Sequence, residues 1–414
     1  MTPSDPVMPA GPLTGLRVLD LSESYGLYCG KLLADLGADV IKVEPPAGSN
    51  ARHMPPFYHN DASSERSLHW FHFNTNKRSI TLNLETADGR DLFHRLAATA
   101  AVVIEDATPG TMAALGVGYD ALSAANPRLV YAAVTAFGQQ GPHAGYKGSD
   151  LIGQAMGGLM FRIGWPEDPP NSLGGLQGLN QVGSHAAVGV MLALTHCDAT
   201  GEGQFVDVSM QEAIAIINYD AMSRFALRRQ VIHRSGPGVG SSGIVATRLW
   251  HCKQGTVRFQ LVGTSVPEWP RLVEWLAGHS MQEDLADEKW RDAATRMAQL
   301  PHIEAVIDRF FMTKTAHELM DEGQARRIMI TAFNTVADLF TEPQLTDEGF
   351  FTSVEHIALG ETVVYPGGPY RFSATPWHIR RPAPALGEYN EAVYVHELGL
   401  RPDDLPRLKA AGAI

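Results

Sequence analysis

The segment from residue 16 to residue 44, LRVLDLSESYGLYCGKLLADLGADVIKVE, constrains the fold more than any other part of the sequence. It begins with an apolar strand, continues with an amphipathic helix centred on KLLADLG and ends with a second apolar strand. A strand, a crossover helix and a second strand form a βαβ unit, in which the two strands pair in parallel. The sequence therefore predicts a parallel sheet with helices packed against it.

The same alternation continues along the chain. We expect a strand at 80–84, a helix capped by Thr86, a strand that ends at Glu105–Asp106 and a strand at 128–138. The Gly-, Ala- and Met-rich stretch from 150 to about 200 is typical of closely packed helices, and residues 205–219 are expected to form a short strand that leads into a long helix. These patterns predict an α/β fold whose large domain, built on a parallel sheet, takes residues 1–225 as its N-terminal part.

A hairpin with Gln254–Gly255 at its turn marks the expected start of a smaller α/β domain over residues 226–330. Residues 265–325 have helical patterning, clearest in EWPRLVEWLAG. The proline-rich segment 365–386 is expected to be an extended arm, because proline disfavours both helices and central strands. We therefore predict two lobes.

Charge and cysteine content exclude several classes of protein. The formal net charge of -12 and the pI near 5.7 argue against nucleic acid or an anionic membrane as the main partner. The three cysteines form no CxxC pair, so neither a disulfide scaffold nor a structural metal site is expected. No stretch approaches the roughly 20 apolar residues of a membrane helix, and we expect a cytoplasmic location.

The opening βαβ unit also admits a nicotinamide dehydrogenase, in which Glu44 would bind a ribose. The turn after the first strand, SESYGLYCG, contains no GxGxxG, which argues against that class. Lys42 and Glu44 are then expected to be strand-end residues that face a cleft.

Three short segments carry polar groups that could bind a ligand. The cluster Asn74, Asn76, Lys77 and Arg78 could meet a phosphate or be a solvated turn. Lys147, Ser149 and Asp150 place a cation, a hydroxyl and a carboxylate before a helix, where the carboxylate could equally be a cap. The glycine loop at 238–243, with Gly240 and Gly243, could surround an oxyanion or be flexible.

Taken in order, these segments resemble the class III (CaiB/BaiF-type) CoA-transferase family from about residue 11 to residue 399. The resemblance is carried by GPLTGLRVLDLS, LLADLGADVIKVEPPAG, FNTNKRSITLNL, VVIEDATPGTMAALGVGYDAL, NPRLVYAAVTAFGQQGP, SDLIGQAMGGLM, ATGEGQFVDVSMQEA and FSATPWHIRRPAPALGEYNEAV. It implies a Rossmann-like large domain to which a C-terminal arm (331–414) returns, with the smaller domain inserted between. It also implies an interlocked dimer.

The resemblance implies that the chain handles acyl-CoA and a free carboxylic acid, with coenzyme A as a substrate and no tightly bound cofactor. A dicarboxylate or aromatic acid is the expected acceptor. The positions that would contact CoA are Ser24, Lys77, Leu82, Asp106, Ala107, Ala114, Leu115, Lys147 and Met210, with the glycine loop nearby and Asp150 at the edge of the reacting centre.

One position departs from the family pattern. Family members attack the acyl-CoA with an aspartate carboxylate, and ungapped alignment of GSDLIGQAMGG and TGEGQFVDVSM places that nucleophile at Leu179. No Asp or Glu occurs from 171 to 185. Three hypotheses follow. A paralogous partner chain supplies the aspartate in a heterodimer; or a stand-alone transferase either uses another carboxylate, with Asp150 as the only nearby candidate, or passes the acyl group directly between thiol and carboxylate; or the chain binds acyl-CoA without catalysis.

Overall fold

The computed structural model describes residues 11–63, 65–236, 247–260, 268–357 and 359–414. By their internal contacts these residues form two compact units. The first contains the described residues up to Leu159 together with Ser172–Asn218 and Gln344–Ile414, and the second contains Met160–Asn171 and the described part of Tyr219–Pro343. The division predicted at 225/226 and 330/331 stays a prediction, and each unit is described by itself.

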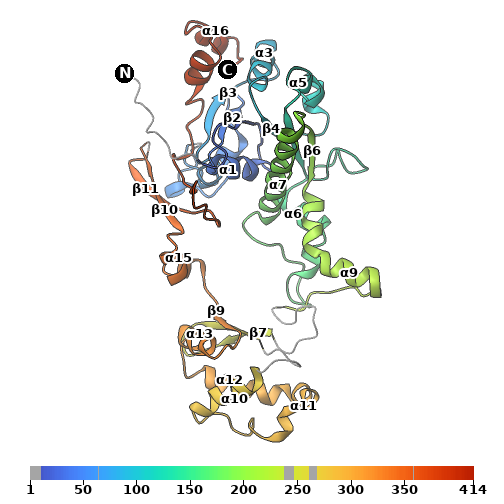
Figure 1. Cartoon of the computed structure of the whole chain (residues 1–414), viewed down its shortest axis with the longest axis vertical. Helices are drawn as coiled ribbons and strands as arrows, with labels where there is room; N and C mark the ends of the chain where they lie inside the picture. Colours follow the sequence, from blue (N-terminus) through green and yellow to red (C-terminus); the bar gives the residue numbers. More distant parts are fainter. Residues whose placement is uncertain (1–10, 64, 237–246, 261–267, 358) are drawn as a thin grey trace. The chain divides into compact units, whose positions relative to one another are not determined.

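A six-stranded parallel sheet forms the centre of the first unit, in the order β3-β2-β1-β4-β5-β6 (Figure 1). Its strands are β1 (Arg17–Asp20), β2 (Asp39–Glu44), β3 (Arg78–Thr81), β4 (Val102–Glu105), β5 (Val130–Thr135) and β6 (Phe205–Ser209). This order is that of the Rossmann fold, in which the direction of winding reverses between β1 and β4. The predicted α/β class and Rossmann-like sheet are confirmed. The predicted strand at 80–84 begins earlier, at Arg78, where it pairs with Ile41.

Crossover helices connect these strands, and Thr86 caps one of them as predicted by accepting a hydrogen bond from the Gly89 N–H. The connecting elements are α1 (Leu27–Asp35), η1 (Asn50–His53), η2 (Tyr58–Asn60), α2 (Leu68–Phe73), α3 (Ala87–Ala97), α4 (Thr111–Ala114), α5 (Tyr119–Ala125), α6 (Asp150–Met156) and α7 (Gln177–Thr200), and α8 (Met210–Ala215) and η4 (Ile216–Asn218) follow the last strand. Residues 205–219 therefore form a strand followed by short helical pieces rather than one long helix.

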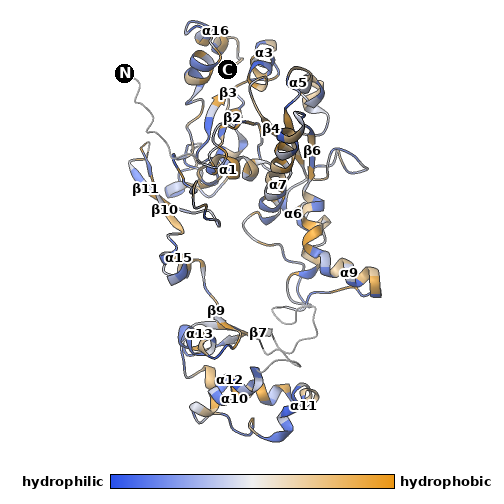
Figure 2. Ribbon diagram, in the orientation of Figure 1, coloured by the Kyte–Doolittle hydropathy of each residue, from blue (hydrophilic) through white to orange (hydrophobic). Residues whose placement is uncertain are grey.

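Helix α7 packs against α1, β5, β6 and α8 and is the longest helix of this unit. It approaches α1 closely because Gly183 has no side chain: a Cβ there would lie 2.7 Å from the Cβ of Tyr28. On other sides α7 leaves apolar residues uncovered, with Val188 60% and Leu192 67% exposed. Figure 2 colours the ribbon of α7 by the hydropathy of each residue. Its sequence thus combines a buried stripe with exposed apolar positions.

The C-terminal segment returns to the same sheet. After α15 (Pro343–Asp347), the hairpin β10 (Phe351–His356) and β11 (Glu361–Pro366) leads into an extended stretch without helices to about residue 386. Element η6 (Ala392–Glu397) and α16 (Asp404–Ala410) then place Val393, Tyr394 and Leu408 in the core beside Leu19 and Ile80. Burial of these apolar side chains holds the end of the chain against the sheet of the first unit.

The second unit has its own hydrophobic core. A three-stranded antiparallel sheet pairs β7 (Thr247–His251), β8 (Thr256–Gln260) and β9 (Ile330–Ala332), and the β7–β8 turn lies at Gln254–Gly255 as predicted. Its helical elements are η3 (Met160–Arg162), α9 (Tyr219–Arg228), α10 (Glu268–Gly278), η5 (Glu288–Arg291), α11 (Ala293–Ala298), α12 (Leu300–Phe311), α13 (Ala316–Ala325) and α14 (Val336–Leu339). Across the described part of both units, no helix has the length and apolar content that a membrane span needs.

Candidate functional site

The carboxyl ends of β1 to β4 surround a cavity of about 860 Å³. In open α/β sheets this edge, at the point where the strand order reverses, is where ligands bind. The size is also typical of small-molecule sites. The described residues that line the cavity are Leu21, Glu23, Val43, Glu44, Pro45, Pro46, Ala47, Gly48, Asn50, Leu82, Asn83, Leu84, Glu85, Glu105, Asp106, Ala107, Thr108, Met112 and Gly412.

Asp106 binds the turn that connects β1 to α1. Its carboxylate accepts backbone N–H groups from Glu23 (2.8 Å), Ser24 (2.7 Å) and Tyr25 (2.8 Å), and from Gly26 at 3.4 Å. Successive backbone donors before a helix N-terminus make a site suited to an anion. The side chain of Asp106 therefore occupies the place where such a turn would hold a phosphate, and this turn brings Ser24 next to Asp106.

Glu105 and Glu23 are further carboxyl groups at this edge whose pKa values are raised. Burial raises the pKa of Glu105 to about 7, with an added contribution from the negative charges of Asp106 and Asp207. Burial likewise raises the pKa of Glu23, which accepts hydrogen bonds from the Asn50 N–H and the Ser49 hydroxyl. The cavity edge therefore carries acidic groups that hold protons more tightly than in water.

We expect Glu105→Gln to raise the free energy of unfolding at pH 8 by about 2 kcal/mol and to change it little at pH 4. The folded-state pKa of Glu105 lies above its unfolded value, so the folded state loses stability as the pH rises from about 4.5 through 7. Urea unfolding at both pH values measures this. Glu85→Gln, at an exposed carboxyl of the same cavity, serves as the control; an equal pH dependence in wild type and Glu105→Gln would contradict the assignment.

A buried ion-pair cluster lies behind this edge. Asp20, at the end of β1, accepts a hydrogen bond from the Nζ of Lys77 at 2.7 Å and lies 3.5 Å from the Nζ of Lys42; all three side chains are fully buried. Lys77 also donates to the Asn74 side chain and to the Leu27 carbonyl, and burial lowers the pKa of Lys77 to about 8. The expectation that Lys42 faces a cleft is wrong, because its amine points at Asp20 and the Ser22 carbonyl.

The segment from Asn74 to Arg78 is neither a solvated turn nor an open phosphate site. Asn74 and Asn76 are buried, and the Asn76 side chain binds Asp35 and the His378 carbonyl and accepts the Arg380 N–H. It thus anchors the C-terminal arm. Arg78 forms ion pairs with Asp39 and Glu397. The polar residues of this segment are satisfied by residues from distant parts of the chain, which local sequence could not indicate.

Asp150 and Leu179 lie next to each other, and their assignment to a reacting centre stays a prediction. Asp150 begins α6, and its Oδ1 accepts the Leu179 N–H at 3.0 Å, while its Oδ2 accepts the side-chain amide of Gln154 at 2.6 Å. Gln154 is fully buried and also holds both backbone groups of Leu173. Leu176, which precedes α7, provides no side-chain cap, so Asp150 caps the helix from elsewhere in the sequence.

The remaining predicted contact residues lie in four places. Leu82 and Ala107 line the cavity, and Ala114 and Leu115 are at the end of α4, whose Met112 also lines it. Met210 is fully buried at the start of α8, where a Cβ on Gly153 would be 2.3 Å from its Cε. Lys147 is exposed in the loop before α6. Gly240 and Gly243 lie outside the described residues. The CoA contacts assigned to these positions stay a prediction.

Sequence reasoning missed two buried residues, Arg52 and Gln154, whose side chains form hydrogen bonds near the carboxyl end of the sheet. Arg52 is fully buried and binds Glu44 through two hydrogen bonds of 2.7 and 2.9 Å, with its guanidinium 3.7 Å from the Trp70 ring centre. Gln154 was likewise not singled out. An arginine in a polar stretch gives no local signal for burial, although an acid at the end of an apolar strand, such as Glu44, indicates that some cation is needed nearby.

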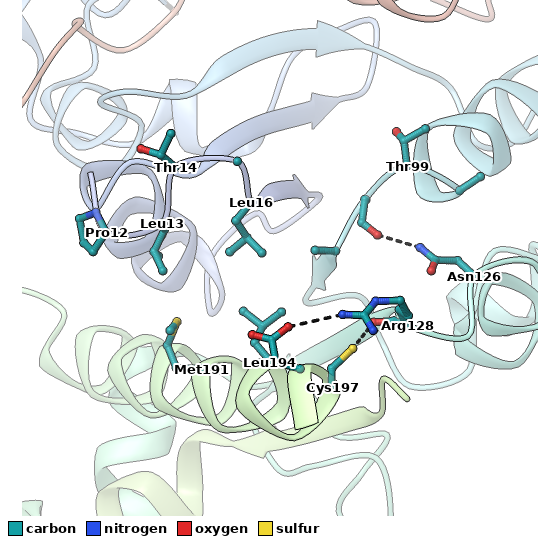
Figure 3. A pocket seen from close by; sticks show the side chains of 15 residues that line it. Pro12, Leu13, Thr14, Leu16, Thr99, Asn126, Arg128, Met191, Leu194 and Cys197 are labelled. Carbon is teal, nitrogen blue, oxygen red and sulfur yellow. Dashed lines mark hydrogen bonds and ion pairs between the residues drawn. The ribbon is translucent and has the colours of Figure 1, made fainter. Parts of the chain in front are cut away.

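A second cavity, of about 490 Å³, lies at the opposite end of the sheet, before β1 (Figure 3). Several of its polar side chains are already paired: Arg128 is 3.4 Å from Asp198, and the Asn126 amide donates to the carbonyls of Ala97 and Ala100. Cys197 donates to the Arg128 carbonyl. Because these groups satisfy one another, and because parallel sheets bind ligands at their carboxyl ends, the first cavity is the candidate site.

Comparison with curated proteins finds relatives along nearly the whole chain. Succinyl-CoA:(R)-benzylsuccinate CoA-transferase subunit BbsE of Thauera aromatica is 32% identical over 96% of this chain and 97% of its own length. The succinyl-CoA–L-malate CoA-transferase beta subunit of Chloroflexus aurantiacus is 30% identical over 97% and 98%, and a formyl-CoA:oxalate CoA-transferase of Streptomyces coelicolor is 31% identical over 98% and 100%.

Solved structures show the same fold. A CaiB/BaiF family protein from Brucella suis matches with a TM-score of 0.82 and 28% identity over 94% of this chain and 100% of its own. A protein from Mycobacterium tuberculosis matches with a TM-score of 0.77 and 26% identity over 93% and 99%. The model of CoA-transferase family III matches residues 13–390. The chain therefore belongs to CoA-transferase family III.

Proposed function

We propose that this chain is one subunit of a two-chain CoA-transferase that moves CoA from an acyl-CoA to a dicarboxylic acid, and that the partner chain supplies the attacking carboxylate. The observation that carries the proposal is Leu179, a buried leucine in the first turn of α7 at the position that the family resemblance assigns to the nucleophile. A leucine side chain has no lone pair with which to attack a thioester.

The contacts of Asp150 favour a partner over a relocated nucleophile. One carboxylate oxygen caps α7 through the Leu179 N–H, and the other accepts from Gln154. An attack on acyl-CoA would remove charge from this carboxylate and weaken both hydrogen bonds. Asp150 is therefore assigned to the structure of the α6–α7 region, and the reacting carboxylate to another chain.

In the proposed reaction the partner's carboxylate attacks the thioester carbonyl, the C–S bond breaks, and a mixed anhydride and CoA thiolate form. The thiolate attacks the enzyme carbonyl of the anhydride, which releases the donor acid and leaves an enzyme CoA thioester. The acceptor carboxylate attacks that thioester to give a second anhydride. Return of the thiolate to the acceptor carbonyl releases the new acyl-CoA and restores the carboxylate.

Two further observations support the partner and the acceptor. Two of the relatives are subunits of CoA-transferases, and benzylsuccinate, malate and oxalate, which appear in the relatives' names, are all dicarboxylates. On α7, the exposed Val188, Met191 and Leu192 leave an apolar surface that association with a second chain would cover. We therefore propose an interlocked pair with a paralogous chain of the same family.

The test is CoA transfer followed by mass spectrometry, with succinyl-CoA as donor and a panel of dicarboxylic acids as acceptors. We expect no transfer by the purified chain alone, and transfer once a family III chain with aspartate at the nucleophile position is co-expressed and co-purified with it. Transfer by the lone chain would contradict the proposal. In that event Asp150→Asn decides the alternative: loss of turnover would identify Asp150 as the nucleophile.

A further inference from the structure

The cavity at the carboxyl ends of β1 to β4 is acidic. Five of its lining residues carry carboxyl groups, and no Lys, Arg or His is among the described residues that line it; the five are Glu23, Glu44, Glu85, Glu105 and Asp106. Coenzyme A carries a phosphomonoester and a diphosphate, which are negatively charged at neutral pH. Glu44 is neutralised by its ion pair with Arg52, and the charges on the other four are all negative. A cavity whose lining charges share one sign repels a ligand of the same sign, most strongly where the walls exclude water.

Four cations of this region are committed elsewhere, and Lys147, which is exposed in the loop before α6, is not among the described residues that line the cavity. Lys42 and Lys77 are fully buried and point at Asp20, and Arg52 is fully buried between Glu44, Glu65 and the Pro384 carbonyl. Arg90 donates to the carbonyls of Leu84 and Glu85. Turning Lys42, Lys77 or Arg52 toward a ligand would leave a buried carboxylate without its partner, which is strongly destabilising.

The backbone donors that could replace a cation are occupied as well. The N–H groups of Glu23, Ser24 and Tyr25, before α1, point at the carboxylate of Asp106. A phosphate could bind these donors if it displaced Asp106, which would then be left close to the phosphate with the same sign of charge. The described lining of the cavity therefore has no basic side chain, and the turn before α1 that could bind a phosphate is already occupied by Asp106.

We propose that this cavity does not hold the nucleotide of CoA at neutral pH, and that the two-chain enzyme binds CoA in the partner's cavity, at one CoA per pair. This inference rests on the proposed function and extends it: the chain lacks the charge needed to hold the substrate as well as the residue needed to attack it. It differs from the expectation, drawn from the resemblance, that Ser24, Leu82, Asp106 and Ala107 contact CoA.

The test is isothermal titration of CoA, and separately of adenosine 3′,5′-bisphosphate, into the full chain at pH 7.5. The variant is Glu85→Lys, because Glu85 is exposed at the cavity and its replacement leaves the buried ion pairs intact. We expect a Kd weaker than about 1 mM for wild type and at least about a tenfold gain for Glu85→Lys, reversed by added salt. Glu202→Lys, exposed on the loop before β6, adds the same charge elsewhere and should give no gain.

A Kd below about 1 mM for wild type would overturn the inference. Unchanged affinity in Glu85→Lys would overturn it too, because charge would then not be what keeps CoA out. An equal gain in CoA affinity in Glu85→Lys and Glu202→Lys would show that added positive charge strengthens binding wherever it is placed. That result would contradict the inference that the charge of the cavity excludes CoA. Neither titration depends on turnover, so this inference can fail while the proposed function stands. The proposed function fails by a different result, which is CoA transfer by the lone chain.

Discussion

Replacing Asp20 by asparagine should lower the free energy of unfolding by about 3–5 kcal/mol, the largest effect on stability that we expect from one substitution here. The change keeps the shape of the side chain but removes the charge that two fully buried lysines, Lys42 and Lys77, share. Burial by itself would raise the pKa of Asp20, yet these two lysines hold it below the ordinary value, so the carboxylate is ionised in the folded state. Urea unfolding at pH 7 measures the loss.

The pH dependence identifies the cause. In Asp20→Asn the buried Lys77 no longer has its carboxylate partner and becomes neutral more readily. Its pKa already lies near 8, so the loss of stability should shrink between pH 7 and pH 9. Asp198→Asn is the control, since its ion pair with Arg128 is exposed and should contribute less than about 1 kcal/mol. A loss below about 1 kcal/mol in Asp20→Asn would contradict this account of the cluster.

Leu179→Asp should lower the free energy of unfolding by about 3 kcal/mol and leave the lone chain without CoA transfer. The buried leucine is replaced by a carboxylate beside Asp150, whose Oδ1 already accepts the Leu179 N–H. Lost apolar burial and an unpaired buried charge both destabilise the folded state, and the N-terminus of α7 offsets a small part of the cost. Thermal unfolding and the transfer assay measure the two outcomes.

Leu179→Asn separates charge from packing, because it removes the same apolar contact without adding a charge. Leu179→Asp should be the less stable of the two at pH 8, and the difference should decrease toward pH 5 as the new carboxyl group takes up a proton. CoA transfer by a fully stable Leu179→Asp chain would contradict both the proposed need for a partner chain and the inference that the cavity excludes CoA. It would show that a single aspartate at position 179 is enough to make this chain bind and transfer CoA.

Local patterns were sufficient for the elements of the fold. The apolar runs at β1 and β2, the Thr86 cap and the Gln254–Gly255 turn could all be identified from neighbouring residues, because strand burial, helix capping and tight turns depend on residues a few positions apart. Boundaries were less accurate. The helical stretch after β6 breaks into α8 and η4, a difference that hydrophobic periodicity does not resolve.

The candidate site was predicted less completely, because its contacts join residues that are far apart in the sequence. The closeness of Asp150 to Leu179 followed from the motifs on either side of them, and the structure joins them with one hydrogen bond. The acidity of the cavity did not follow, because Glu23, Glu85 and Glu105 come from three separate strand ends. None of these acids is unusual in its own segment, and the charge of the cavity appears when the strands are set side by side.

The sequence by itself determined the βαβ alternation, the parallel sheet, the family and the leucine at position 179, since each is encoded by adjacent residues or by their order. The tertiary structure alone decided which charged groups are buried and which residues they pair with. Lys77 reaches Asp20 across 57 positions and Arg52 reaches the Pro384 carbonyl across 332. A buried charge is tolerated only when an opposite charge or a hydrogen-bond partner lies next to it. In this chain such partners come from distant positions in the sequence, and folding brings them together.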